Sequence, residues 1–489
     1  MVAIDLGAES GRALVGLFDG SRLTVQEVHR FRNEPLRRDD RLMWDIDLLR
    51  TGMLDGLRRA TSSAPVATIG VDGWGVDFGL LDGAGRLLAP PVHYRDPGSD
   101  GMVERALTRL SRADIFGTTG TQLLPINTLY RLLAMVSSGD PSVQAARTLL
   151  MIPDLMNREL TGLGVTEYTQ ATTTQCYDTR RGTWAREMLA RLGIPDHFLP
   201  EVMRPGTRLG PVTREIADVT GTGGAMVVVP ATHDTASAVA GLSLGDDGST
   251  AFLSSGTWSS VGLEIDTPDL SRAALAADLS NEGGVDGRIC FLRNVTGLWL
   301  IQECRRAFDP TASRLSYENL AHLAGQASPF VAFIDPDDPR FGRPGDLRAV
   351  VHEYCRETGQ LAPDDAGGLA RVILDSLALK YAATIRDLGA VRGRPIRAIR
   401  IVGGGAQHEL LCRLTAAATG LPVASGPIEA TAIGNLAVQA LAIGELGSLA
   451  EARAMIRRSF PVRQFEPAGD WSAARERFDA ILQRRRTAA

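Results

Sequence analysis

The sequence has few cysteines and lacks the short motifs of the most common nucleotide-binding folds. Its 489 residues include five cysteines and no C-x-x-C pair, so neither a disulfide framework nor a zinc site is indicated and a reducing compartment is expected. The chain also contains no G-x-x-x-x-G-K-[ST] phosphate loop and no G-x-G-x-x-G dinucleotide motif. Any phosphate-binding loop in this protein must therefore be of another kind.

Long apolar and strongly basic segments are missing as well. The formal net charge is -5 and hydrophobic residues make up 44%, which is typical of a globular protein in water and argues against nucleic acid or an anionic membrane as the main partner. The longest apolar stretch, residues 225–244, contains His233 and Asp234 and does not predict a membrane span. The first residues show no basic region followed by an apolar one, so a cytoplasmic protein without a secretory signal is expected.

The length and the order of short apolar runs predict two large α/β lobes. Strands are expected over residues 2–6, 12–19 and 22–31, and a strand–turn–strand pattern recurs at residues 68–82 and 249–265. The similarity of the first and last hairpins suggests that the two lobes are structurally related. A turn-rich segment at residues 242–249 is the best boundary, which divides the chain into lobes 1–243 and 244–489. One helix is expected to begin at Asp45 or Asp47, and a second, long helix over residues 365–389 is expected to end at Gly389.

The turn DLGAESGR joins two of the expected strands and resembles a phosphate-holding loop. Gly7 and Gly11 let the backbone turn tightly with its N–H groups exposed to an anion, while Ser10 adds a hydroxyl and Arg12 a cation. Asp5 is suited to hold Mg²⁺ through its water shell. A P-loop would pass from a strand into a helix instead. The residues alone also permit an ordinary hairpin with Asp5 as a turn former.

A buried strand, MVVVP, runs into Thr232-His233-Asp234-Thr235 and then a helix of small residues. Either Asp234 or Thr235 caps that helix, or Asp234 is a base that faces a cleft. An ordinary aspartate, with a pKa of about 3.9, is a poor base for a hydroxyl, but phosphoryl transfer tolerates one because proton acceptance comes late. A hydrolytic His233–Asp234 dyad is disfavoured, because adjacent residues of an extended segment point to opposite sides.

Three further segments are candidates for lining a ligand site. The turn in LSSGTWSSVG, with Gly256 and Thr257, is either a second phosphate clamp or a polar surface turn. The glycines of IRIVGGGAQHELL let a flat ligand approach the backbone, or simply form a closely packed strand–helix joint. Asn294 and Gln302, about two helical turns apart, either line one side of a cleft or are structural amides.

The segments GVDGWGVDFGLL and HYRDPGSDG carry the side chains of a possible sugar site. Trp74 offers an apolar ring face, and Asp72, Asp77, Arg95 and Asp96 offer bidentate hydrogen bonds to hydroxyls. The alternative is a buried tryptophan and a surface Arg–Asp ion pair.

The order of these motifs along one chain resembles the FGGY carbohydrate kinases. The motifs are AIDLGAESGR, GVDGWGVDFGLLD, YRD, THDTASA, LSSGTWS, NVTGLWLIQ and IVGGGAQ, and the similarity extends from about residue 3 to past residue 463. The resemblance implies an α/β fold of two ribonuclease-H-like lobes, as in actin and hexokinase, with an active-site cleft between them. WGVDF, ATTTQ and HDTASAV together are most similar to members that phosphorylate the 1-hydroxyl of L-rhamnulose with MgATP.

The resemblance also implies roles for individual residues. Asp234 matches the catalytic base, and the sugar-contacting positions are Gly75, His233 and Thr235. The matches on the nucleotide side are Ala8, Glu9, Ser10, Gly11 and Arg12 in the first phosphate loop, Thr257 in the second, and Asn294, Gln302 and Gly404. Glu9 and Gly73 depart from the usual residues of the family.

The expected protein is thus an enzyme of L-rhamnose breakdown, in which ATP phosphates lie between two hairpins and Asp234 accepts the hydroxyl proton. Two alternatives stay open. One is a kinase for another ketose or polyol, such as L-fuculose, D-xylulose, L-ribulose or glycerol. The other is a non-enzymatic nucleotide switch of the same fold. The sequence leaves open whether the chain is a monomer or a homodimer.

Overall fold

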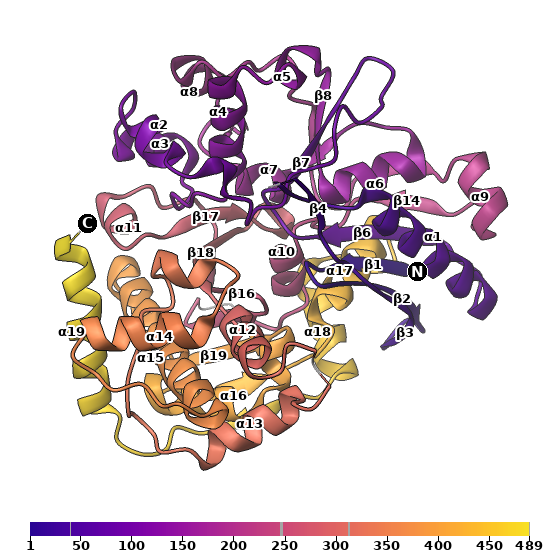
Figure 1. Ribbon diagram of the computed structural model, residues 1–489. Coiled ribbons are helices and arrows are strands. Elements are labelled where there is room, and N and C mark those ends of the chain that lie inside the picture. Colours follow the sequence, from indigo (N-terminus) through magenta and orange to yellow (C-terminus); the bar gives the residue numbers. More distant parts are fainter. Residues whose placement is uncertain (40, 245–247, 312, 489) are drawn as a thin grey trace. The chain divides into compact units, whose positions relative to one another are not determined.

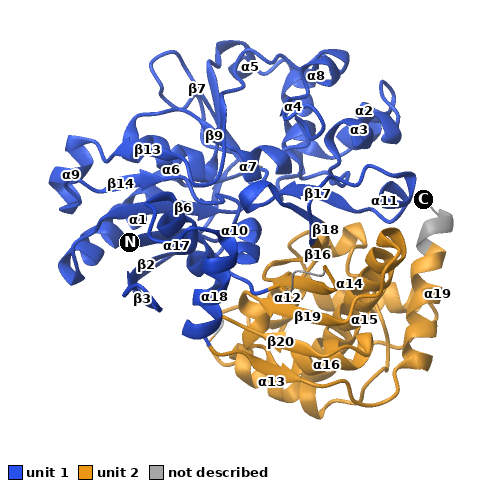
Figure 2. Ribbon diagram, turned by 180° about the vertical axis from the view of Figure 1, so that it is seen from behind, with its two compact units in different colours: residues 1–243, 264–291, 429–460 blue, residues 244–263, 292–428, 461–489 orange. Residues whose placement is uncertain are grey.

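The computed structural model describes residues 1–39, 41–244, 248–311 and 313–488, which form two compact units (Figure 2). Unit 1 comprises residues 1–243, 264–291 and 429–460, and unit 2 comprises residues 244–263, 292–428 and 461–489. Each unit is therefore assembled from separate stretches of the chain. The predicted boundary segment, residues 242–249, lies partly outside the described residues, and the division into lobes 1–243 and 244–489 stays a prediction.

Unit 1 is built on a six-stranded sheet with the order β13-β14-β6-β1-β2-β3 (Figure 1). Its strands are β1 (Val2–Leu6), β2 (Ser10–Phe18), β3 (Leu23–Arg32), β6 (Thr68–Gly73), β13 (Arg208–Pro211) and β14 (Met226–Val228). The predicted meander of the first three strands is confirmed. β1 is antiparallel to β2, where Asp5 is opposite Arg12, and parallel to β6, where Asp5 is opposite Asp72. The register thus places a cation and a second carboxyl beside Asp5.

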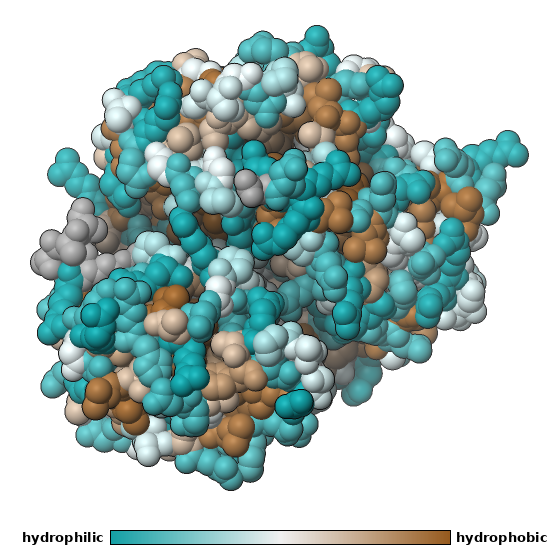
Figure 3. All heavy atoms as spheres, in the orientation of Figure 1, coloured by the Kyte–Doolittle hydropathy of each residue, from teal (hydrophilic) through white to brown (hydrophobic). Residues whose placement is uncertain are grey.

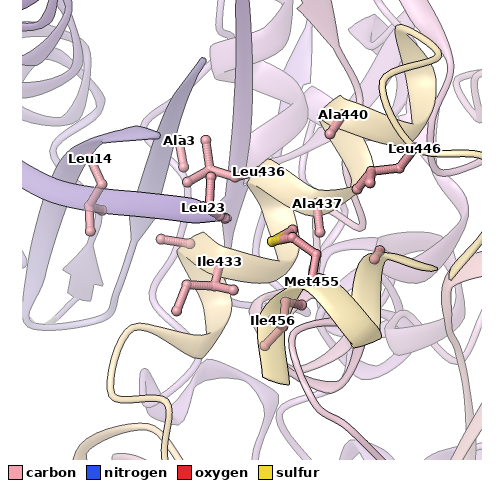
Figure 4. Packing of buried hydrophobic residues seen from close by; sticks show 12 residues of the cluster. Ala3, Leu14, Leu23, Ile433, Leu436, Ala437, Ala440, Leu446, Met455 and Ile456 are labelled. Atoms are coloured by element: carbon pink, nitrogen blue, oxygen red, sulfur yellow. The ribbon is translucent and has the colours of Figure 1, made fainter. Parts of the chain in front are cut away.

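Helices α1 (Ile46–Ser63) and α17 (Ala430–Ala442) both pack against this sheet. Asp45 caps α1, as predicted, and accepts a hydrogen bond from Leu48 N at 2.9 Å. On the side of α17, Leu14 and Leu23 of the sheet meet apolar residues of α17 and α18 (Leu449–Ser459), as Figure 4 shows. This core attaches a late segment of the chain to the first strands.

Helix α10 (Asp234–Ala240) follows β14 and packs closely against α17. The contact requires glycine at position 434, since a Cβ there would lie 1.8 Å from Ser237 O. A Cβ on Gly241 would likewise lie 2.4 Å from Ala430 O. Small residues in α10 and α17 therefore fix the start of α10, where Asp234 lies.

The predicted strand–turn–strand pattern at residues 68–82 does contain two strands, β6 and β7 (Phe78–Leu81), but they do not pair. β7 is antiparallel to β8 (Thr148–Met151) instead, so the interpretation of this segment as a hairpin is wrong. Val76 in the bend has a φ of 68°. The bend carries the chain from one sheet to another, and its pairing is decided by distant segments.

The second sheet has seven strands in the order β17-β18-β16-β15-β19-β20-β21. They are β15 (Thr250–Ser255), β16 (Trp258–Ile265), β17 (Ser280–Gly283), β18 (Ile289–Thr296), β19 (Ala398–Val402), β20 (Val423–Ser425) and β21 (Arg463–Phe465). The predicted hairpin of β15 and β16 is confirmed. β15 is antiparallel to the following strand and parallel to the later β19, as β1 is to β2 and β6. The two sheets therefore share this arrangement.

The predicted long helix of unit 2 is α15 (Ala366–Arg392), but it does not end at Gly389. It continues to Arg392 and is closed by Gly393, which adopts the left-handed conformation with a φ of 63°. Among the described residues, no helix is long and apolar enough to cross a lipid bilayer. Figure 3 shows a face on which hydrophilic residues predominate and hydrophobic residues lie in small groups.

Candidate active site

Asp234 is the first residue of α10, and the helix cap is His233 rather than Asp234 or Thr235. Asp234 Oδ1 accepts hydrogen bonds from Thr235 N at 2.5 Å and from Thr235 Oγ1 at 3.3 Å. Burial raises the pKa of Asp234 to about 7, and repulsion from Asp5 adds to the effect. The carboxyl is therefore far more basic than an ordinary aspartate. A base with this pKa is suited to accept a proton near neutral pH.

His233 and Asp234 do not point to opposite sides, as an extended segment would require. His233 Nε2 lies 3.5 Å from Asp234 Oδ1, because the backbone changes from extended at His233 to helical at Asp234. The expectation from the extended segment is wrong for this reason.

Asp5 lies in a buried group of charged side chains at the end of β1. The Arg12 guanidinium is ion-paired with both Asp5 and Glu429. Asp72 is fully buried beside Asp5, and its Oδ2 accepts a hydrogen bond from Asn435 Nδ2 at 2.5 Å. Burial, followed by repulsion from Asp5, raises the pKa of Asp72 well above its ordinary value.

Asp5, Asp72 and Asp234 are neighbouring carboxyl groups at the expected magnesium site. Within the described parts of the chain, no group of three or more His, Cys, Asp or Glu side chains is arranged to hold a metal ion. Mg²⁺ needs only one or two protein carboxylates when phosphates and water supply the other ligands. Burial is the main cause of the raised pKa values of Asp72 and Asp234, and the repulsion from Asp5 that adds to it is a reason for a cation to bind here. Asp5 therefore fits the expected role, with Arg12 as its present partner.

The Trp–Gly bend after β6 is held by buried contacts. The ring centroids of Trp74 and Trp44 are 4.2 Å apart, and both indole N–H groups donate to Asp77 Oδ2, at 3.0 and 2.6 Å. Burial raises the pKa of Asp77 to about 7, although these hydrogen bonds oppose the rise. A Cβ on Gly75 would lie 2.9 Å from Thr173 Oγ1, so only glycine fits there.

Sequence reasoning assigned no role to the helix that holds this bend, α7 (Tyr168–Thr173). Gln170 Nε2 donates to the carbonyl oxygens of Gly73, Trp74 and Thr232, at 3.2, 3.1 and 3.0 Å. Glu167, which caps α7, accepts from Thr232 N at 3.1 Å and from Thr232 Oγ1 at 2.9 Å. α7 thus joins the Trp–Gly bend to the segment that carries Asp234. The only signal in the sequence was a run of polar residues at ATTTQ.

Asp96, predicted to bind sugar, has its carboxylate occupied by protein donors. They are Leu42 N at 2.8 Å, Gly98 N at 2.9 Å, and Arg41 Nε and Arg131 Nη1 at 3.1 Å each. Burial alone would raise the pKa of Asp96, but these partners lower it. The geometry favours a structural role for Asp96, as a buried ion pair with Arg41 and Arg131 rather than the expected surface pair within its own segment. Arg95 lies over the Tyr94 ring, with Cζ 5.2 Å from the centroid.

In the loop predicted to bind phosphate, Gly7 N donates to Ser10 O at 3.0 Å and Asn33 Nδ2 donates to Gly7 O at 2.9 Å. A Cβ on Gly11 would lie 2.1 Å from the Phe31 ring, so packing alone requires this glycine. Ala8 is partly buried and Glu9 is exposed. The loop is therefore a hairpin held by its own backbone.

In unit 2, Thr257 lies in the turn between β15 and β16, and its carbonyl oxygen accepts from Gly297 N at 3.2 Å. Asn294 and Gln302 are not on one helix, so the predicted two-turn spacing is wrong. Asn294 belongs to β18, where its Oδ1 accepts from Ser260 Oγ at 2.7 Å, and Gln302 belongs to α12 (Trp299–Phe308). Gln302 Oε1 is buried and has no hydrogen-bond partner among the described residues.

The three glycines after β19 differ in their surroundings. A Cβ on Gly403 would lie 2.7 Å from Ser255 O, and one on Gly405 would lie 2.2 Å from Ser255 Oγ. A Cβ on Gly404 would meet nothing closer than 3.9 Å. Two of the glycines therefore serve packing, and Gly404 is the one with open space beside it.

Comparison with solved structures defines the class of fold. A gluconate kinase from Lactobacillus acidophilus matches with a TM-score of 0.80 at 16% identity, covering 99% of this chain and 97% of its own. A Plasmodium falciparum glycerol kinase with ADP matches with a TM-score of 0.75 at 15% identity, covering 100% and 98%. The predicted α/β class with two actin-like sheets is thereby confirmed.

Family models and sequence relatives identify the family. The N-terminal and C-terminal domains of the "FGGY family of carbohydrate kinases" match residues 1–241 and 251–443. Curated relatives named rhamnulokinase include those of Bacteroides thetaiotaomicron, 40% identical over 475 residues (96% of this chain, 97% of the relative), and Pectobacterium carotovorum, 40% identical over 496 residues (99% and 96%). The chain belongs to the FGGY family of carbohydrate kinases and is an ATP-dependent sugar kinase.

Proposed function

We propose that this enzyme transfers the γ-phosphoryl group of ATP to the 1-hydroxyl of L-rhamnulose, a step of L-rhamnose breakdown in the cytoplasm. Support for the sugar comes from the names of the curated relatives, which align over nearly the whole chain. The solved structures carry the names of gluconate, xylulose and glycerol kinases, so the fold alone does not select among sugars.

The observation that carries the mechanism is the partly buried Asp234, with its pKa raised to about 7 at the start of α10. Asp234 accepts the proton of the sugar hydroxyl as the oxygen attacks the γ-phosphorus. Because the transition state of phosphoryl transfer is loose, orientation of the hydroxyl matters more than early deprotonation. α7 supplies that orientation by holding the segments of Trp74, Gly75 and His233 together.

On the nucleotide side, the backbone of residues 8–12 and Thr257 would bind the ATP phosphates. Asn294, Gln302 and Gly404 would lie near the nucleoside, where the unpaired Gln302 Oε1 offers an acceptor and Gly404 leaves room. Asp5 would hold Mg²⁺ through water, and the ion would neutralise part of the phosphate charge.

The test is a panel of ketoses and polyols with MgATP, read by ADP release. We expect the highest kcat/KM with L-rhamnulose. A clear preference for L-fuculose, D-xylulose, L-ribulose or glycerol would refute the assignment of the sugar. ATP binding without sugar-stimulated turnover would support a nucleotide switch and refute the kinase.

A further inference from the structure

The His233 ring in unit 1 lies between two carboxyl groups. Its Nε2 is 3.5 Å from Asp234 Oδ1, and its Nδ1 is 3.6 Å from Glu282 Oε2. Glu282 lies on β17, far along the chain from His233, and belongs to none of the motifs that the sequence analysis identified. The mechanism proposed above uses Asp234 and gives Glu282 no role.

Glu282 and His233 are positioned by the same helix. Gly283 N, next to Glu282, donates to Thr172 Oγ1 at 2.8 Å, and His233 N donates to Thr169 Oγ1 at 3.0 Å. Both threonines belong to α7. The hydroxyls of one helix thus set the separation of the glutamate and the imidazole.

Glu282 and His233 are both buried, so the electrostatic interaction between them is only weakly screened by water. The side chains of Glu282 and His233 are only 4% and 11% exposed, so each needs a polar neighbour to offset lost hydration. Burial lowers the pKa of His233, although Glu282 opposes this effect, so the imidazole is neutral near pH 7. A neutral imidazole has one N–H and one acceptor nitrogen, and each ring nitrogen of His233 faces a carboxyl group. Because the pKa of Asp234 is about 7, its carboxyl is partly protonated at neutral pH and can then donate to Nε2, which leaves the N–H at Nδ1, beside Glu282. Nε2 is then the acceptor, and it faces Asp234.

We propose that Glu282 is a positioning residue that orients the Nδ1–H of His233 and thereby keeps Nε2 as an acceptor on the side of Asp234, where the sugar hydroxyl is bound. The hydroxyl proton passes to Asp234 Oδ1 as the oxygen–phosphorus bond forms, and it leaves Asp234 for water after the transfer, while His233 stays neutral. Separations of 3.5 and 3.6 Å are long for hydrogen bonds, but catalytic hydrogen bonds often shorten when substrate binds. The proposal rests on the proposed function, in which Asp234 is the base.

A double-mutant cycle tests whether Glu282 acts through His233. We expect Glu282→Gln to lower kcat about tenfold, a typical loss for a residue that orients a catalytic group, with the KM for MgATP unchanged. In a His233→Gln background, the same change should alter kcat less than twofold, because the imidazole that Glu282 orients is no longer present. An equal loss in both backgrounds would overturn the proposal.

The matched control is Asn281→Ala, one residue away on β17. Asn281 accepts from Asp269 N at 2.7 Å and donates to Gly120 O at 3.1 Å, so its loss should reduce stability. Any effect of this variant on kcat should be the same with and without His233→Gln. If the effects on kcat are non-additive with His233→Gln for Glu282→Gln but additive for Asn281→Ala, Glu282 positions His233 and the result is not due to a general disturbance of the strand.

A spectroscopic arm separates this proposal from the proposed function. In protein labelled with ¹⁵N-histidine, the His233 ring signals can be assigned by their loss in His233→Gln. We expect the Nδ1–H tautomer in the wild type and a shift toward Nε2–H in Glu282→Gln. An Nε2–H tautomer in the wild type would overturn the pairing even if L-rhamnulose is the substrate. If no sugar is turned over, the proposed function fails and this measurement still decides the pairing.

Discussion

Replacing Asp234 with asparagine should lower activity and raise stability at the same time. Asparagine has nearly the same shape but cannot accept the hydroxyl proton, so turnover should fall by about 10²- to 10⁴-fold, the usual contribution of a general base. The same change removes a carboxyl whose charged form is disfavoured by burial and by Asp5. The ionised carboxylate of Asp234 is therefore expected to destabilise the folded protein.

The size of the stability gain follows from the pKa of Asp234. Its pKa rises from 3.8 to about 7 on folding, and each pH unit corresponds to about 1.4 kcal/mol. Because the side chain is 36% exposed, solvent screening reduces the maximum of about 4 kcal/mol to about 1–2 kcal/mol. The stabilisation that goes with the bound proton is complete below pH 4 and is lost as the pH rises to about 7. The free energy of unfolding of Asp234→Asn should therefore exceed that of the wild type by about 1–2 kcal/mol at pH 8, and the two should be equal near pH 4.

The assay is urea unfolding at both pH values, together with kcat at saturating L-rhamnulose and MgATP. Asp375→Asn is the control, because Asp375 is another buried carboxyl with a raised pKa, and it lies in unit 2, paired with Arg371. It should keep turnover within twofold of the wild type. Near wild-type turnover in a folded Asp234→Asn protein would refute its role as base, and a loss of stability at pH 8 would refute the electrostatic argument.

Three further outcomes are expected. The kcat of the wild type should fall about tenfold for each pH unit below pH 7, because Asp234 must be ionised, and a flat profile from pH 5 to 8 would contradict this. Gly434→Ala should lose about 1–3 kcal/mol of unfolding free energy through its clash with α10, whereas Gly117→Ala in α3 (Arg112–Thr119), which meets no atom within 4 Å, should be neutral or stabilising in the same urea titration. Asp96→Ala leaves Arg131 buried without its partner and should cost about 3–5 kcal/mol of unfolding free energy without changing the order of sugars in the panel. A changed order at full stability would support the predicted sugar-binding role of Asp96.

Local sequence patterns were sufficient for several elements and failed for others. The alternation of apolar residues and turn formers predicted β1 to β3 and the hairpin of β15 and β16, because these strands pair with their neighbours in sequence. The pairing of β6 and β7 could not be predicted in the same way, since each pairs with a distant strand. The end of α15 was misplaced because Gly389 is tolerated inside the helix, and the left-handed turn comes only at Gly393.

Candidate site residues show a similar division. Asp5 and Arg12 were identified from one turn, and the structure pairs them across β1 and β2. Asn294 and Gln302 were placed on one helix because their spacing of eight residues fits two turns, but the change from strand to helix falls between them. Spacing alone could not locate that change, since both segments are apolar enough to be buried.

By itself, the sequence determined the strands and turns that form from neighbouring residues, the order of motifs and the membership of the FGGY family. Only the tertiary structure decided that residues 264–291 and 429–460 join unit 1, that α7 holds the Trp–Gly bend, and that Glu282 lies beside His233. It also decided the pKa of Asp234. The physical reason is that burial and charge repulsion depend on groups brought together from distant parts of the chain, and no local pattern records those distances.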